Sequence, residues 1–559
     1  MRICGLKLTH DAAVCVIEDG KLLFSVELEK VGNATRYTEM KSMSAIDMVL
    51  EKFGFEFMDI DIFVIDGWRG SSVSVDGKIF PVSGYTEFDG LKLPLLASRP
   101  ADNHNYYSSY SHIASHIFGA YATSPFAEGL EPCYVLTWDG GTQPRIHYID
   151  PLSEVQVHYI ASDFPIYGTF YMDMGLFFGP YNEHLVEILA YDGGDGGDDW
   201  RGLVRRYGSY GIPGKLMSYI AMGTPHSTLV DWLVMECASV FNRYAFDQET
   251  HQPNAAEKFQ FNLLKSIYHH AHGKISDADI LASIHLWLET ELVRMACRAI
   301  PSGSNLCFVG GSALNIKWNS ALRESGYFKS VWVPPFPNDC GSAIGAAVCE
   351  MIATTGNWKL DWDVYLGPRI KKGDISKYGW MESPCDVSYL ARLIHENPQE
   401  PFVVLHGRAE LGPRALGHRS IFCSAEHASN KDMLNSIKNR ELFRPVAPIC
   451  LESHAPLIFS PGTPDPYMLF DHIVKEFWLS KVPAIVHIDN TARLQTVGPD
   501  DSPFVFDLLS TYFGLSGIPL LCNTSANFNG KGFFPDVASA MEWGKTKFIW
   551  SEGVLYERS

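Results

Sequence analysis

The sequence predicts a mixed α/β protein with a large two-lobed unit followed by a second α/β unit. Three apolar runs typical of strands end in Gly- or Asp-containing turns within the first part of the chain; they are residues 3–7, CYVLTWDGG and NLCFVGGSALN. A low-periodicity stretch at 355–385 is typical of a linker, and FVVLHGRAELGPRALGHRS begins a further unit at about residue 398. The length of 559 residues also exceeds what a single hydrophobic core usually supports.

Each element of the first unit has its own signal. The two apolar runs around Asp19-Gly20 predict a hairpin, preceded by the turn LTHDAA where the first strand ends. The Gly310-Gly311 pair ends the third strand and leads into a helix expected from Leu314. Such a turn lets a backbone approach a ligand closely and places a helix N-terminus beside it, which is compatible with a nucleotide contact.

Composition excludes several classes of function. The formal charge of −19 would repel a nucleic-acid backbone, so we expect no nucleic-acid partner. No apolar run is long enough to span a bilayer, and the N-terminus lacks a secretory pattern, so we expect a cytoplasmic protein without a membrane partner. The twelve cysteines form no CxxC pair and are expected to be reduced core residues.

The pair His112 and His116, in SHIASH, is four residues apart and so shares one face of a predicted helix. Two imidazoles on one face can bind one metal ion, but two histidines can also belong to an ordinary core. Asp139 and Asp339 stand at strand-to-turn junctions, where carboxylates can complete such a site.

The Gly/Asp-rich segment 183–210 lacks the EF-hand order of calcium ligands and is expected to be a surface excursion.

The second unit supplies basic residues in glycine-rich surroundings. Arginines in such turns are better suited to bidentate recognition of a phosphate or carboxylate than to a solvated position on the surface. Ion pairing with the abundant acidic residues is the alternative for any one arginine, but four clusters in one unit favour an anion site. The clusters are GRAELGPRALGHRS, IKNRELFRP, HIDNTARLQTV and CNTSANFNGKG.

These strings, with THDAA, SHIASH, TWDGG, PGKLM, GGSALN and PNDCGSAIGAA, closely resemble the NodU/CmcH family of O-carbamoyltransferases over nearly the whole chain. The resemblance implies an actin/sugar-kinase/Hsp70-like ATPase-type domain at 1–365 and a YrdC-like domain at 366–559. It also implies ATP-dependent formation of carbamoyl adenylate from carbamoyl phosphate, followed by carbamoyl transfer to a hydroxyl of a small molecule. The opening LTHDAAV…LLFSVELEK…TRY looks closest to the antibiotic-biosynthesis branch, and a homodimer is compatible with the family.

The resemblance also implies roles for individual residues. His10 matches the proposed general base, for which the ordinary histidine pKa near about 6.5 is suitable. The implied metal is Fe(II), with Mg(II) as an alternative ion. The remaining matches are His112, His116, Asp139 and Asp339 as metal ligands, Gly311 and Asn315 as carbamoyl-adenylate contacts, and Arg414, Lys438, Arg444, Arg493, Asn523 and Ser525 as the carbamoyl phosphate and ATP pocket.

Two departures from the family pattern leave questions open. Many members carry an ERF-type string after the first hairpin, where this chain reads ELEKVGNATRY, so the basic contact falls to either Lys30 or Arg36. The chain also reads NTSAN where members usually read NTSFN. The alternative function is that of a tRNA threonylcarbamoyl-type enzyme, which the acidic composition disfavours. A third possibility is a non-catalytic nucleotide-binding protein, which the retention of His10 and of all four metal-ligand matches disfavours.

Overall fold

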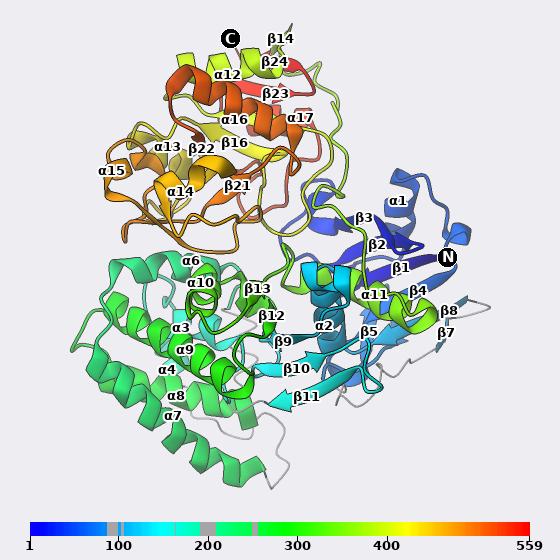
Figure 1. Cartoon of the computed structure of the whole chain (residues 1–559), viewed down its shortest axis with the longest axis vertical. Coiled ribbons are helices and arrows are strands. Elements are labelled where there is room, and N and C mark those ends of the chain that lie inside the picture. Colours follow the sequence, from blue (N-terminus) through cyan, green and yellow to red (C-terminus); the bar gives the residue numbers. More distant parts are fainter. Residues whose placement is uncertain (87–98, 102–104, 162–163, 191–207, 249–254, 559) are drawn as a thin grey trace. The chain divides into compact units, whose positions relative to one another are not determined.

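The computed structural model describes residues 1–86, 99–101, 105–161, 164–190, 208–248 and 255–558 (Figure 1). The chain divides into two compact units, which we describe separately. The first comprises Met1–Pro132, Asp150–Val157 and Trp332–Ser559, and the second comprises Cys133–Ile149 and His158–Val331.

The first unit contains a six-stranded sheet whose first strand in the chain lies in its middle. One side of β1 pairs antiparallel with β2, and β2 pairs antiparallel with β3; the other side pairs parallel with β4. Asp19 (φ 48°) and Gly20 (φ 86°) both have positive φ, as a tight hairpin turn requires, so the predicted hairpin is confirmed. In spatial order the strands are β3 (Lys21–Glu27), β2 (Ala13–Glu18), β1 (Arg2–Lys7), β4 (Ile62–Asp66), β8 (Asn105–Tyr110) and β7 (Arg99–Ala101).

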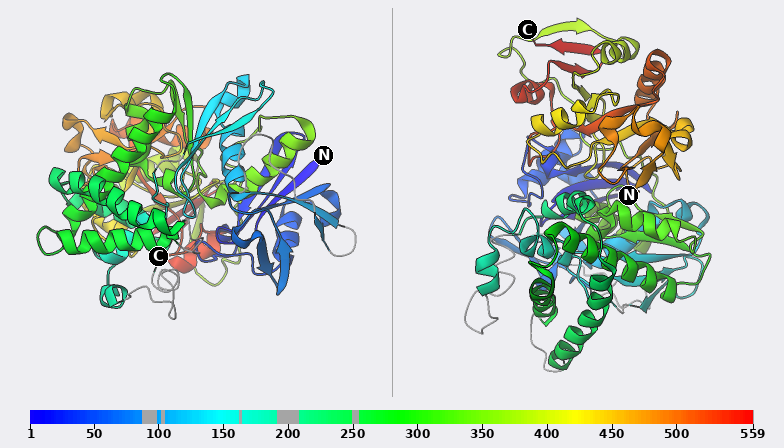
Figure 2. Two further views of the ribbon diagram at one scale, coloured as in Figure 1. Left: turned by 90° about the horizontal axis from the view of Figure 1, so that it is seen from below. Right: turned by 90° about the vertical axis from the view of Figure 1, so that its left-hand side faces the viewer.

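Helices α2 (His112–Ala122) and α11 (Ser342–Thr355) pack side by side in the first unit (Figures 1 and 2). They cross without room for a side chain, because a Cβ added at Gly345 would lie 1.9 Å from the carbonyl oxygen of Ser115. The glycine therefore fixes the position of α2, the helix that carries the histidine pair.

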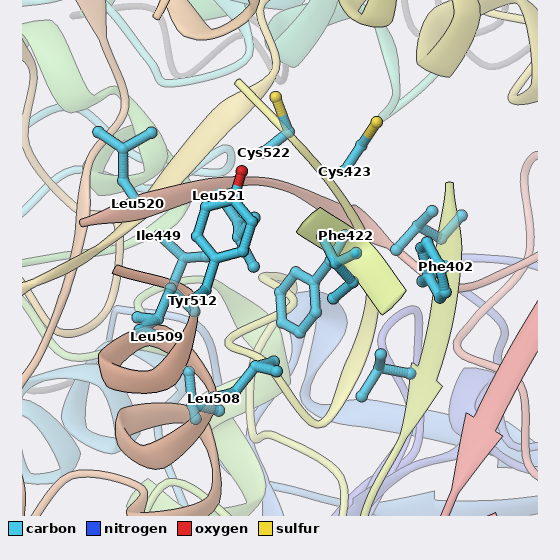
Figure 3. Close-up of a cluster of buried hydrophobic side chains, with 14 of the residues drawn as sticks. Phe402, Phe422, Cys423, Ile449, Leu508, Leu509, Tyr512, Leu520, Leu521 and Cys522 are labelled. Carbon is cyan, nitrogen blue, oxygen red and sulfur yellow. The ribbon is translucent and has the colours of Figure 1, made fainter. Parts of the chain in front are cut away.

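The last part of the first unit is an eight-stranded mixed sheet with its own core. Helix α12 (Val387–Glu396) packs along α16 (Pro503–Ser516), and in Figure 3 the α16 side chains Leu508 and Tyr512 face Phe422 of the sheet. The strand order is β14 (Met381–Pro384), β24 (Val554–Glu557), β23 (Phe548–Ser551), β15 (Phe402–Leu405), β16 (Arg419–Cys423), β22 (Leu520–Ser525), β17 (Ala447–Leu451) and β21 (Gln495–Val497). The shorter helices are α13 (Ser429–Ile437), α14 (Ala455–Ile458), α15 (Glu476–Leu479) and α17 (Val537–Trp543).

The second unit repeats the strand order of the first sheet. Its first strand, β9, again lies between an antiparallel neighbour, β10, and a parallel one, β12. The order is β11 (Val157–Ala161), β10 (Arg145–Ile149), β9 (Cys133–Thr137), β12 (Asn305–Val309) and β13 (Ser330–Trp332). Its helices are α3 (Phe170–Phe177), α4 (Leu185–Ala190), α6 (Ile212–Tyr219), α7 (Ser227–Gln248), α8 (Ala255–Ala271), α9 (Asp277–Ala299) and α10 (Ile316–Glu324).

The structure confirms the predicted mixed α/β class, and two sheets of like order agree with the two-lobed expectation. The helix after the Gly pair begins at Ile316, two residues later than predicted, because Gly311–Leu314 form a 3₁₀ turn first. All twelve cysteines are free, and eleven are buried. No helix in the described part of the chain is long and apolar enough to cross a membrane.

Two other sequence-based expectations need qualification. The stretch 355–385 is mostly irregular, as a linker should be, but it ends in β14 and its Asp361 bonds backbone to backbone with Leu22. Of the Gly/Asp-rich segment 183–210, residues 191–207 lie outside the described residues, while Leu185–Ala190 form α4.

Candidate metal and anion sites

Helix α2 carries both histidines of SHIASH into the interior of the first unit. Ser111 caps the helix by accepting a hydrogen bond from the Ala114 N–H (3.3 Å), so the helix begins at His112 itself. His112 and His116, one turn apart, are both buried. They are therefore placed by local sequence signals, as predicted.

The two imidazoles converge on Asp339, which lies in the 3₁₀ turn Asp339–Gly341 immediately before α11. Asp339 Oδ1 is 3.3 Å from His112 Nε2 and 3.6 Å from His116 Nε2, and the two Nε2 atoms are 3.2 Å apart. Ligands about 2.1 Å from a shared ion lie roughly 3.0–3.4 Å from one another. The three residues therefore fit a divalent metal ion, and the core alternative for the histidine pair explains this convergence less well.

Two charged residues that the sequence did not single out surround this site. Lys7 Nζ lies 2.9 Å from Asp66 Oδ2 and 2.9 Å from Asp339 Oδ2. Asp66 Oδ2 also lies 2.7 Å from His112 Nδ1. Burial opposes the charge on both carboxylates, but the positive charge of Lys7 lowers the pKa of Asp66 and of Asp339 below the ordinary range.

His10 follows β1 and lies at the edge of the same cluster. Its Nδ1 is 3.1 Å from Asp11 Oδ2, and its Nε2 is 3.5 Å from Asp339 Oδ2. Burial lowers the pKa of His10, but the two carboxylates outweigh burial and raise it above the ordinary value. The ring packs edge-on against Trp68, with centroids 5.3 Å apart. The structure thus places His10 beside a predicted metal ligand.

Asp139, Gly311 and Asn315 lie together in the second unit. Asp139 follows β9, and its Oδ1 accepts a hydrogen bond from the Gly311 N–H (2.8 Å). Gly310 has φ 97°, and a Cβ there would lie 2.5 Å from the Trp138 carbonyl oxygen, so the close approach requires glycine. Asn315 caps α10, its Oδ1 accepting from the N–H groups of Lys317 (3.2 Å) and Trp318 (3.4 Å). The structure therefore gives Asn315 a capping role that the sequence analysis did not predict.

Arginines from three of the four basic strings, together with Arg36, lie close enough in the first unit to influence one another electrostatically, and each is half-buried. Burial, followed by the neighbouring charges of Arg493 and Arg36, lowers the pKa of Arg414; burial and then Arg444 lower the pKa of Arg493 to about 10. Like charges gathered at a half-buried place are costly unless an anion lies among them. We refer to Arg36, Arg414, Arg440, Arg444 and Arg493 as the arginine cluster.

Three of the residues predicted for the pocket form hydrogen bonds with other groups of the protein. Lys438 is buried, and its Nζ donates to Ser525 O (2.7 Å), Asn527 O (2.7 Å) and Asn527 Oδ1, which uses all three of its protons. Asn523 donates to Ala415 O (3.0 Å). The Ser525 hydroxyl donates to Asn527 Oδ1 (2.7 Å). In the described structure these residues fix the NTSAN loop, and Lys438 has no proton left for a phosphate.

The structure distinguishes the two alternatives for the N-terminal basic contact. Lys30 Nζ donates to Glu410 O (2.6 Å) and Gly412 O (2.7 Å) and pairs with Glu27, so its protons are used. Arg36 instead contributes its charge to the arginine cluster.

Arg440 belongs to the basic string IKNRELFRP, but it is not among the residues that the resemblance assigns to the phosphate pocket. It donates from Nη1 to Thr524 Oγ1 (3.0 Å) and from Nη2 to Ser525 Oγ (3.3 Å) within the NTSAN motif. Its place in KNRELFRP, two residues after Lys438, was the available signal.

The sequence matches two family models. "Carbamoyltransferase N-terminus" matches residues 2–76 and 85–348, and "Carbamoyltransferase C-terminus" matches residues 394–549. Nodulation protein U of Sinorhizobium fredii is 43% identical over 100% of this chain and 99% of its own length. The 3'-hydroxymethylcephem-O-carbamoyltransferase of Streptomyces clavuligerus is 30% identical over 97% of this chain and 96% of its own length.

These identities do not support placement in the antibiotic branch, because the nodulation proteins share more residues with this chain than the cephem enzymes do.

Among solved structures, component A of (R)-2-hydroxyglutaryl-CoA dehydratase from Acidaminococcus fermentans covers 63% of this chain and all of its own, at 15% identity and a TM-score of 0.32. Full-length HypF covers 63% of this chain and 56% of its own, at 12% identity and a TM-score of 0.31. At these scores neither structure adds to the fold described above.

Proposed function

The chain belongs to the carbamoyltransferase family, and on that premise we propose that it is an ATP-dependent O-carbamoyltransferase acting on a small molecule. The proposed reaction has two steps. Carbamoyl phosphate, ATP and water give carbamoyl adenylate, phosphate and pyrophosphate. The carbamoyl carbon is then attacked by an alcohol oxygen of the acceptor, and AMP leaves as the carbamate ester forms.

The arginine cluster is the observation that carries this proposal. Both substrates of the first step are phosphates, and an overall charge of −19 makes a local concentration of guanidinium groups necessary to bind them. The cluster lies in the region of the C-terminal family model, apart from Arg36. Arg414, Arg444 and Arg493 are assigned to phosphate contacts, and Arg440 joins them. Lys438, Asn523 and Ser525 are assigned to support the pocket by fixing the NTSAN motif through their hydrogen bonds.

His10 is assigned as the general base of the transfer step. Its position beside Asp339 places it near the predicted metal ligands, and a histidine can accept the proton that the acceptor hydroxyl loses. Asp11 holds its other ring nitrogen and so orients the imidazole.

His112, His116 and Asp339 are assigned as ligands of a divalent metal, proposed to be Fe(II). Asp139 is assigned as the fourth ligand from the family resemblance. When bound, the ion would supply positive charge to the adenylate phosphate. Gly311 and Asn315 are assigned to carbamoyl-adenylate contacts, the glycine through its backbone.

The acceptor is proposed to be a hydroxylated small molecule. The name of the cephem relatives specifies O-carbamoylation of a hydroxymethyl group, which supports an alcohol oxygen as the nucleophile. An antibiotic scaffold is one such acceptor, and the greater identity to the nodulation proteins argues for testing other scaffolds first.

The two steps can be tested separately. The purified protein with carbamoyl phosphate and ATP should release pyrophosphate and phosphate without any acceptor. If neither product is released, the proposed first step is wrong. His10→Asn should leave pyrophosphate release within about twofold while abolishing transfer to an added acceptor. Equal loss of both activities would remove His10 as the base.

A further inference from the structure

A lysine lies buried against the predicted metal site, where a metal-binding protein would ordinarily avoid a second cation. Lys7, on β1, is 1% exposed. Its Nζ bridges Asp66 Oδ2 and Asp339 Oδ2, each at 2.9 Å, and lies 4.3 Å from the centre of the Trp68 ring. A buried ammonium ion is expensive to desolvate, so its retention calls for a compensating role.

Asp66 acts on the site through His112. Both Lys7 Nζ and His112 Nδ1 approach the same oxygen, Asp66 Oδ2, at 2.9 and 2.7 Å. A neutral histidine that donates Nδ1–H to a carboxylate keeps the lone pair of Nε2 for a metal. His112 Nε2 is the atom that faces His116 and Asp339. Asp66 is therefore placed to fix the tautomer and the ring orientation that metal binding needs.

Lys7 acts on the site through Asp339. The Oδ1 atom of Asp339 faces the histidines, whereas its Oδ2 atom faces Lys7. A cation bound by Oδ1 would share this carboxylate with Lys7 and would feel the repulsion of the ammonium charge. The same ammonium lies between Asp66 and Asp339 and holds these two negatively charged carboxylates together.

We propose that Lys7 and Asp66 are positioning residues that tune metal affinity in opposite directions. Asp66 raises the affinity by presenting His112 Nε2, and Lys7 lowers it by competing for Asp339. Lys7 thereby keeps the ligands preorganised while preventing the ion from being held too tightly. The proposal rests on the metal site of the proposed function and not on the carbamoyl chemistry.

Cobalt(II) binding to the full-length, metal-stripped protein tests this directly, because the visible absorbance of bound Co(II) reports occupancy without any turnover. Asp66→Asn should weaken binding by about 10- to 100-fold, the usual cost of removing a partner that orients a ligand. Lys7→Met, similar in length but uncharged, should tighten binding by about tenfold or more. Lys7→Gln should also tighten it, which provides a second variant if Lys7→Met folds poorly.

A matched control separates tuning from general damage. Glu350 on α11 is also buried and accepts a hydrogen bond from the Tyr110 hydroxyl (2.9 Å), so Glu350→Gln alters a buried carboxyl group elsewhere in this unit. It should change Co(II) affinity by less than about twofold. Weaker binding in both Lys7 variants, or unchanged binding in the Lys7 and Asp66 variants, would overturn the proposal. Absence of Co(II) binding by the unaltered protein, or binding that survives His112→Ala, would instead overturn the metal site itself.

Discussion

His418, in the motif GRAELGPRALGHRS, offers a test of how the Arg414 loop is stabilised. The imidazole is 8% exposed and stacks on Tyr365 with ring centroids 3.7 Å apart. Its Nδ1 lies 2.8 Å from the Arg408 carbonyl oxygen, to which it donates, and its Nε2 lies 3.1 Å from Ser502 Oγ, from which it accepts. A neutral ring satisfies both contacts without the cost of burying a charge.

The expected pH dependence follows from this environment. Burial, reinforced by the nearby His406 and Arg419, lowers the pKa of His418 to about 3, although the Arg408 carbonyl acts the other way. Between pH 6.5 and 3 the unfolded chain binds a proton that the folded chain excludes, so folding stability falls as the pH is lowered. At pH 5, which is about 1.5 units below the unfolded pKa, the loss is about 2 kcal/mol relative to pH 8.

The comparison of the unaltered protein with His418→Gln isolates this contribution, because other titrating groups are common to both. At pH 8 the variant should be less stable, since it loses the stacking on Tyr365. On going to pH 5 the difference should shrink by about 2 kcal/mol. Native-state hydrogen exchange of the β16 amides, corrected for intrinsic exchange rates, measures this locally. A stability difference that stays constant between pH 8 and pH 5 would refute the assignment of a neutral, buried His418.

Three further predictions concern the two sites. Arg440→Lys should lower pyrophosphate release by about 100-fold or more, because lysine cannot bridge two partners as a planar guanidinium does; near-normal release would remove Arg440 from the pocket. Gly345→Ala should destabilise the first unit by more than about 2 kcal/mol and reduce Co(II) binding, since the new Cβ meets the α2 backbone. Gly514→Ala is its control, because a Cβ added at this helical glycine has no other atom within 4 Å. This variant should leave the free energy of unfolding in urea unchanged or slightly increased. Chelation should lower the thermal unfolding temperature of the metal-loaded protein, and re-addition of Co(II) should restore it, whereas His112→Ala should show no such change.

The features that the sequence predicted well have local causes. The spacing of His112 and His116 and the capping serine before them specify one helix face, and Asp19-Gly20 specifies a hairpin. Lys7 and Asp66 had no such signal, because each is a single charge at the end of an apolar strand. Lys7 and Asp66 lie 59 residues apart in the chain, and Asp66 and His112 lie 46 apart, so only the tertiary fold brings them together.

The same limit applies to the anion site. The four basic strings predict an anion site, but which cations are available to a ligand depends on acceptors supplied by distant backbone. Lys438 donates its protons to carbonyls 87 and 89 residues away, and Lys30 donates to carbonyls 380 and 382 residues away. Composition cannot distinguish these saturated lysines from the members of the arginine cluster.

The segment before Tyr37 pairs with the far end of the chain: Arg36 N–H donates to Gly530 O (3.0 Å), and Gly532 N–H donates to Ala34 O (3.0 Å). A gene cut at the apparent linker would therefore divide the arginine cluster, since Arg36 would be encoded on one piece and Arg440 on the other. Exchange of C-terminal halves between relatives would in turn combine the other four arginines of the cluster with a foreign segment at the position of Arg36. Chimeras that transfer the first forty or so residues together with the last two hundred should therefore retain phosphate binding better than chimeras joined at the linker alone.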